Sequence, residues 1–305
     1  MKKNSYPIVL VVIILLLGTW LFGNKLEMSN NPTTNRGAFE KHWFDGKAEV
    51  CSYDLEQNRY GEVRKGDAVL IFVTEDFSAS RQVKLDHAES SKKDAVKVLK
   101  LNKTKEFRTG IYPYHIMTSV FTDIDQMQTL KTSHSVQEWC GHTYLQFNRK
   151  KENYHLVGHS YFEQEVETDT TLKAVTLEDE LWTLIRIDPD KIKRGPQKIV
   201  ASGITFRLTH VNPHIQDGTI TIQDAGNGEM SKSKLELTLG NRYVMIEFDR
   251  QFPHTIYGWE EYKDEGGKKT MIAKAQLKKK MRLPYWQLNH SVDTGWRDSL
   301  ALNVK

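Results

Sequence analysis

Cysteine is scarce in this chain, with two in 305 residues, which is too few for a fold stabilised by several disulfides. The chain also has only a small excess of positive charge. It holds 43 Lys and Arg and 39 Asp and Glu, so the net charge is +4. With 39% hydrophobic and 27% charged residues, the composition excludes a disordered, collagen-like or coiled-coil chain. Only one stretch is apolar enough to span a membrane, which excludes a protein with several membrane passes.

Familiar catalytic motifs are missing as well. The sequence contains no Gly-x-Ser-x-Gly elbow, no His-Glu-x-x-His zinc motif, no phosphate-binding P-loop and no dinucleotide fingerprint. Its acidic residues are scattered and form no Asp-x-Asp-x-Asp-Gly calcium loop. These absences favour a protein that is not an enzyme. If the protein catalyses a reaction, its catalytic residues do not belong to any of these motifs.

The first 24 residues have the pattern of an export signal or membrane anchor. Lys2 and Lys3 precede an apolar run that begins at Ile8 and continues to Phe22, and no charge follows before Lys25. The bulky residues 20–22 do not suit signal peptidase and fit an aromatic belt, so we expect an uncleaved helix. We therefore predict a single-pass membrane protein, with its N-terminus inside and its C-terminal domain on the periplasmic side of the inner membrane. A cleaved and exported protein is the second choice, and a buried core helix is the third.

Residues 25–36 are rich in Asn, Ser, Thr and Pro and predict a flexible tether. Residues 37–305 would then form an extracytoplasmic β-rich domain, with a seam near 165–195. Because residues 1–25 hold three lysines and no acid, the remainder of the chain has a net charge of only +1. Such a weak charge produces no field that would attract nucleic acid, so we expect no nucleic-acid partner.

Stretches of alternating polar and apolar residues, separated by turn residues, dominate the remainder of the chain. This alternation predicts antiparallel strands, and the clearest hairpin joins 235–239 to 243–248 through Gly240-Asn241. One segment departs from the pattern: Thr176 is a suitable N-cap for a helix over 177–185, which Pro189 would end. The sequence thus predicts a mainly β fold, a large antiparallel curved sheet or barrel with one short helix. Further strands are expected at 48–53, 69–73, 96–101, 204–211 and 218–222.

One group of residues has the chemistry of a reactive site. Two strands flanking the polar turn at 148–153 would place His142 opposite His159, and Cys140 opposite Tyr161. Glu138, two residues before Cys140, would share their face. Cys140, His142 and His159 could then bind zinc with a fourth position open, or His142 could activate Cys140 as a catalytic nucleophile. In either case Glu138 and Tyr161 would contact the ligand.

The alternative for this group is structural, with Cys140 and His142 packing and hydrogen-bonding inside a barrel. A disulfide between Cys51 and Cys140 is also open, and it would remove both the nucleophile and the thiolate ligand. We therefore predict no cofactor, with zinc as the alternative.

Several motifs together resemble a known family. They are Arg-Tyr-Gly-Glu at 59–62, Ala-Val-Leu-Ile-Phe-Val-Thr-Glu-Asp-Phe at 68–77, Gly-Ile-Tyr-Pro-Tyr at 110–114, Gln-Glu-Trp-Cys-Gly at 137–141, and Trp182. This set resembles uncharacterised bacterial envelope proteins, usually lipoproteins, that often carry the label "septum formation inhibitor Maf". The resemblance runs from about Trp43 to the end, but the lipobox cysteine is missing, so the hydrophobic helix would be the anchor.

The Maf label does not fit the residues of this chain. True Maf proteins are cytosolic nucleotide pyrophosphatases with a Ser-x-Ser-Pro-Arg-Arg loop, which is absent here. The resemblance therefore implies a compartment, the bacterial envelope, and no activity.

These features predict a membrane-anchored envelope protein that binds an apolar or amphipathic ligand, such as a lipid, or an envelope protein, in the concavity of its sheet. The alternative is an extracytoplasmic metal- or thiol-dependent hydrolase that uses Cys140, His142 and His159. A purely structural module that binds a partner protein is the third hypothesis.

Overall fold

The computed structural model describes residues 36–163, 165, 167–225 and 231–302. The predicted anchor helix at 1–24 and all but the last residue of the predicted tether lie outside these ranges. The chain divides into two compact units, Met1–Ala38 and Phe39–Lys305. The first unit is described only at residues 36–38, whereas the second is described over most of its length. Within the described ranges, no helix is both long and apolar enough to cross a membrane.

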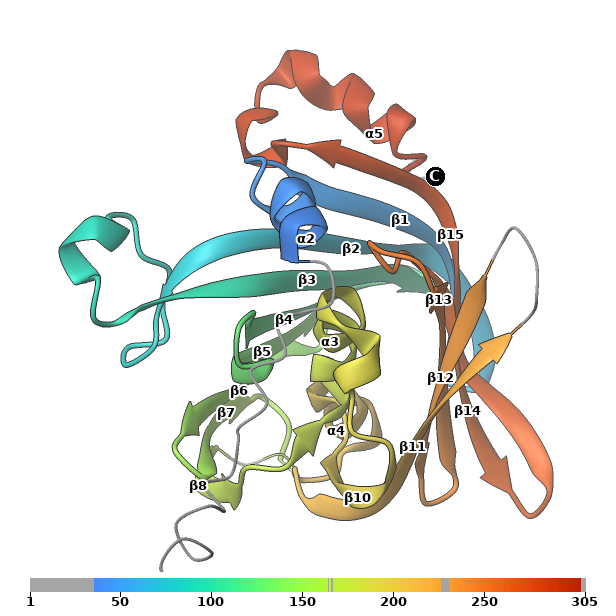
Figure 1. Ribbon diagram of the computed structural model, residues 1–305. Helices are drawn as coiled ribbons and strands as arrows, with labels where there is room; N and C mark the ends of the chain where they lie inside the picture. Colours follow the sequence, from blue (N-terminus) through green and yellow to red (C-terminus); the bar gives the residue numbers. More distant parts are fainter. Residues whose placement is uncertain (1–35, 164, 166, 226–230, 303–305) are drawn as a thin grey trace, which may run out of the picture. The chain divides into compact units, whose positions relative to one another are not determined.

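The second unit is built on one curved sheet of fifteen strands (Figure 1). The strands are β1 (Ala48–Arg59), β2 (Glu62–Ser78), β3 (Ala95–Thr109), β4 (Tyr112–Asp123), β5 (Gln128–Glu138), β6 (Gly141–Lys150), β7 (Asn153–Ser160), β8 (Thr168–Lys173), β9 (Thr176–Leu177), β10 (Gly195–Val200), β11 (Ile215–Ala225), β12 (Lys232–Leu239), β13 (Arg242–Asp249), β14 (Ile256–Glu265) and β15 (Lys268–Leu283). Their order across the sheet is β8-β7-β6-β5-β4-β3-β2-β1-β15-β14-β13-β12-β11-β10-β9. Neighbours are antiparallel except β9 and β10. No pairing of described residues joins the edge strands β8 and β9, so the sheet is open.

Four α-helices and five short 3₁₀ helices accompany the sheet in the described ranges. They are α2 (Arg36–Trp43), α3 (Leu181–Ile187), α4 (Gly203–Thr209) and α5 (Gly295–Ser299), with η1 (Ala88–Ser91), η2 (Glu178–Glu180), η3 (Pro189–Lys191), η4 (Tyr285–Gln287) and η5 (Ser291–Thr294). Helices α3 and α4 lie within the curve of the sheet (Figure 1). Every side chain of α3 is buried, so this helix fills the concave side.

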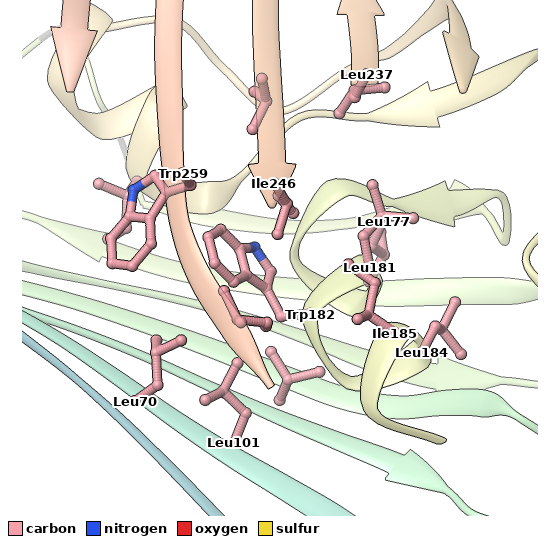
Figure 2. Close-up of a cluster of buried hydrophobic side chains, with 14 of the residues drawn as sticks. Leu70, Leu101, Leu177, Leu181, Trp182, Leu184, Ile185, Leu237, Ile246 and Trp259 are labelled. Atoms are coloured by element: carbon pink, nitrogen blue, oxygen red, sulfur yellow. The ribbon is translucent and has the colours of Figure 1, made fainter. Parts of the chain in front are cut away.

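Large apolar side chains hold α3 against the sheet (Figure 2). Trp182 of α3 meets Trp259 of β14 edge to face, with ring centroids 5.0 Å apart. Such an aromatic pair contributes about 0.5–1.5 kcal/mol beyond the area that it buries. Leu70 of β2 and Leu101 of β3 belong to the same cluster, and so does Leu237 of β12. The helix therefore packs against strands from both halves of the sheet.

The prediction of a mainly β, antiparallel and curved sheet is confirmed, and its open form matches the predicted curved sheet rather than a barrel. The clearest predicted hairpin is also confirmed, because Leu239 of β12 pairs with Arg242 of β13 around the predicted turn. Gly240 in that turn has a φ of +58°, a conformation that glycine adopts without steric cost.

Two element predictions were wrong. Thr176 does not cap a helix, because 176–177 form β9 and pair with β10, and α3 begins only at Leu181. The segment 204–211, predicted as a strand, is mostly helix α4. Ser202 caps this helix by accepting a hydrogen bond from the Ile204 N–H at 3.3 Å, and His210 ends it with a φ of +55°. The concave side therefore holds two helices where one was expected.

Candidate functional site

A cavity of about 340 Å³, which we call the chamber, lies between the inner face of the sheet and α4. Helix α4 supplies much of its apolar wall through Ile204, Phe206 and Leu208, and Ile116 of β4 and Leu239 of β12 add to it. This volume falls within the range of roughly 300–1,000 Å³ that is usual for small-molecule sites. Exposed residues mark its mouth: Thr209, Val211, His214, Asn241 and Lys263.

The deep end of the chamber is formed by six buried ionisable side chains, which we call the charged floor. They are Lys103 and Lys105 of β3, Glu178 and Asp179 of η2, Arg242 of β13, and Glu261 of β14, and none of these residues as a whole is more than 9% exposed. All but Asp179 line the chamber directly. Buried charges are costly unless they are paired, so their contacts decide what the site can bind.

Arg242 is the centre of the charged floor. Its Nη1 donates to Glu178 Oε2 at 2.6 Å and its Nη2 to Glu178 Oε1 at 2.8 Å, which is the bidentate geometry that favours arginine. The same Nη2 lies 2.7 Å from Glu261 Oε2. Burial would raise the pKa of Glu261, but Lys105 and Arg242 outweigh it and hold that pKa at about 2. Glu261 is therefore ionised near neutral pH.

The start of α4 supplies hydrogen-bond donors to the first two acids of η2, Glu178 and Asp179. The Ser202 N–H donates to Glu178 Oε2 at 3.0 Å, and the Ser202 hydroxyl donates to Asp179 Oδ1 at 2.9 Å. The Gly203 N–H donates to Asp179 Oδ2 at 3.3 Å. Lys105 lies 3.4 Å from Glu261 Oε1. Each of the six carboxylate oxygens of the charged floor thus has a donor.

Lys103 is the exception in this network. Its Nζ is 3.7 Å from Asp179 Oδ1 and 4.2 Å from the centroid of the Trp182 ring, and no hydrogen bond joins it to another residue of the described ranges. Burial lowers the pKa of Lys103, because the charged ammonium is removed from water. The chamber therefore contains a buried donor group whose hydrogen-bonding capacity is unused.

A close contact sets the position of α4 against the sheet. A Cβ atom on Gly203 would lie only 2.4 Å from the ring of His134 on β5, so the helix can approach this strand only with glycine there. His134 is buried, and its Nδ1 lies 3.4 Å from the hydroxyl of Thr118, which lines the chamber. Burial lowers the pKa of His134, which favours the neutral imidazole.

The residues predicted as a reactive site lie away from the chamber, near the β5–β6 and β6–β7 hairpins. The predicted register was wrong by two residues, because Tyr144, and not His142, lies opposite His159. Cys140 is not on a strand at all: β5 and β6 pair up to Glu138 and Gly141, which leaves Cys140 in the tight turn between them. His142 and His159 still point to the same face, on adjacent strands.

Contacts in this turn oppose a reactive thiolate. The Cys140 N–H donates to Glu138 Oε2 at 2.7 Å, and the nearby carboxylate raises the pKa of the Cys140 thiol. Tyr161 packs its ring over Gly141, and His159 Nδ1 lies 3.5 Å from Glu167. In the described part of the chain, no three His, Cys, Asp or Glu residues are placed to hold a metal ion. The catalytic, ligand-binding and metal roles assigned to these residues stay predictions.

The two cysteines are not bridged in this structure. Cys51 is buried on β1, and Cys140 is exposed in the β5–β6 turn, and both are free. Burial raises the pKa of Cys51 well above its usual value, so its thiol stays protonated and packs as a small apolar group.

No protein-family model matches the chain, and no curated protein matches it. Among solved structures, a β-barrel-like protein of domain of unknown function DUF1849 from Brucella abortus is similar, with 11% sequence identity and a TM-score of 0.39. The similarity covers 77% of this chain and 98% of that one. The resemblance to envelope proteins that the motifs indicate stays a prediction.

Proposed function

We propose that this protein binds a small amphipathic molecule in the chamber. The observation that carries the proposal is the division of one cavity into an apolar wall on α4 and a buried charged floor on the sheet and η2. An apolar wall stabilises a hydrocarbon or ring by removing it from water, at about 25 cal/mol per Å². A few polar groups at one end would orient the bound molecule.

We also propose that binding takes place on the periplasmic side of the inner membrane, with residues 1–24 as the anchor. The support is the uncharged apolar run between Lys3 and Lys25. When the chain is expressed in a Gram-negative host, protease added to intact spheroplasts should degrade the domain. Complete protection, with degradation only after lysis, would place the domain inside the cell.

The binding proposal is tested with N-phenyl-1-naphthylamine, a neutral probe whose fluorescence rises in apolar surroundings. We expect saturable binding of about one probe per chain. The Thr205→Trp variant should weaken it at least tenfold, because Thr205 lies on the chamber side of α4 and a large ring there would fill the space. The dissociation constants come from fluorescence titrations of the full chain in detergent.

Thr221→Trp is the matched control, since Thr221 is exposed on β11 and does not line the chamber. This variant should bind the probe as the unmodified protein does. Equal weakening by both tryptophan substitutions, or no saturable binding by the unmodified protein, would overturn the proposed function.

A further inference from the structure

We infer that the polar end of the bound molecule is a carboxylate, held by the ammonium group of Lys103 with Lys105 beside it. This inference rests on the proposed function and specifies its ligand class as acyl chains or similar apolar molecules that end in a single carboxylate. The apolar part would lie along Ile116 and the α4 side chains that form the wall.

The first argument is an imbalance between donors and acceptors. Every carboxylate oxygen of Glu178, Asp179 and Glu261 already has a donor within 3.4 Å. The Lys103 ammonium has three N–H donors and no hydrogen bond to another side chain of the described ranges; its ion-pair contact with Asp179 Oδ1 is long, at 3.7 Å, although the side chain is only 8% exposed. A ligand that accepts hydrogen bonds supplies what the Lys103 ammonium lacks, whereas a ligand that only donates would compete with the donors already placed on these carboxylates.

The second argument is position. Lys103 and Lys105 are two residues apart on β3 and both point to the inner face, so their backbones are about 7 Å apart. A carboxylate has two oxygens and can contact both ammonium groups from the chamber, which both lysines line. Charge-assisted hydrogen bonds of this kind are about twice as strong as neutral ones.

The third argument is charge. The charged floor holds three cations and three carboxylates, so it is neutral as a whole when all are ionised. One added monoanion leaves a single excess negative charge, next to the Lys103 ammonium, while a phosphate dianion leaves two in a site shielded from water. A cationic head group would instead lie next to the Lys103 ammonium, which has the same sign, and would bring no negative charge to offset it. The site therefore favours a carboxylate over both.

The test uses four dodecyl compounds that displace N-phenyl-1-naphthylamine from the unmodified full-length protein, each below its critical micelle concentration. We expect dodecanoate to bind at least about tenfold more tightly than dodecanol, which has the same chain and no charge. Dodecyl phosphate and dodecyltrimethylammonium should both bind more weakly than dodecanoate. The comparison between ligands needs no variant, so it does not depend on how a substitution folds.

Variants then assign the preference to a residue. Lys103→Met should reduce the preference for dodecanoate over dodecanol to less than about threefold. Lys100→Met is the control on the same strand, because Lys100 points to the opposite face and pairs with Glu75 at 3.1 Å, and it should keep the preference. A preference that survives in Lys103→Met overturns the assignment to this residue.

The outcomes separate the two proposals. Equal binding of dodecanoate and dodecanol, or tighter binding of the phosphate or the ammonium compound, overturns the carboxylate inference while the chamber remains a binding site. Failure of the probe and of all four compounds to bind overturns the proposed function itself.

Discussion

Replacement of Arg186 by methionine is expected to lower the free energy of unfolding by about 3–5 kcal/mol, the usual cost of breaking a buried ion pair on one side. Arg186 lies on α3 with no exposed surface, and its Nη1 is 2.6 Å from Oε1 of Glu49 on β1, which is equally buried. Its Nε donates to the carbonyl of Pro253 at 2.8 Å, and its guanidinium lies 4.7 Å from the centroid of the Phe72 ring. Methionine keeps the volume but leaves the Glu49 carboxylate without its main counterion.

The double variant Arg186→Met with Glu49→Leu tests this explanation. Because both charges are then gone, we expect it to be at least about 1–2 kcal/mol more stable than Arg186→Met alone. Urea midpoints of the four proteins in the cycle give the coupling energy. Additive effects of the two substitutions would show that the pair does not act as a unit and that α3 is held by packing alone.

Stability should also depend on pH through Glu180, which ends η2 where α3 begins. Burial raises the pKa of Glu180 to about 7, although a hydrogen bond to Thr129 works in the opposite direction. The folded pKa lies above the ordinary value of 4.5, so the folded state favours the protonated acid. This contribution is fully present below pH 4.5 and is lost as the pH rises through 7. The loss is on the order of 3 kcal/mol by linkage.

Glu180→Gln removes this titration. We expect the variant to be more stable than the unmodified protein at pH 8, by an amount on the order of 3 kcal/mol, and nearly equal to it at pH 4.5, as measured by urea unfolding at both pH values. Glu89→Gln is the control, because that side chain is 88% exposed on η1 and should change neither value. Parallel pH profiles for the unmodified protein and Glu180→Gln would show that Glu180 titrates normally.

Strands were predictable from the sequence where local alternation and turn residues agree. The hairpin of β12 and β13 is the clearest example, since alternation on both sides and Gly240-Asn241 between them specify one register. In the β6–β7 hairpin only a broad polar turn was visible. Its true centre is Lys151-Glu152, with Lys151 at a φ of +56°, and the shift of this centre by one residue moves every cross-strand pair by two.

Helix α4 shows the limit of local patterns. Its residues alternate like a strand, but Ser202 and Gly203 dock on Glu178 and Asp179 of η2, and a helix starts there. These contacts join residues more than twenty positions apart, so a local pattern does not reveal them. The charged floor was missed for the same reason, because its members come from four separate elements. One local signal was available: residues 99, 101, 103, 105 and 107 form one buried face of β3, and lysines interrupt it at 103 and 105.

The pairing of β1 with β15 has a consequence for the newly made chain. Ala48 lies opposite Leu283, so β1, the first strand of the sheet in sequence and a central one in space, has one neighbour about 235 residues away in sequence. A ribosome produces β1 first, and its backbone edge stays without a partner until the last strand emerges. Strands β1 to β8 can zip together by successive hairpins in the meantime, so the joining of the two halves is the slow, late event of folding. During that interval the bare edge of β1 is where a second unfinished copy could add on.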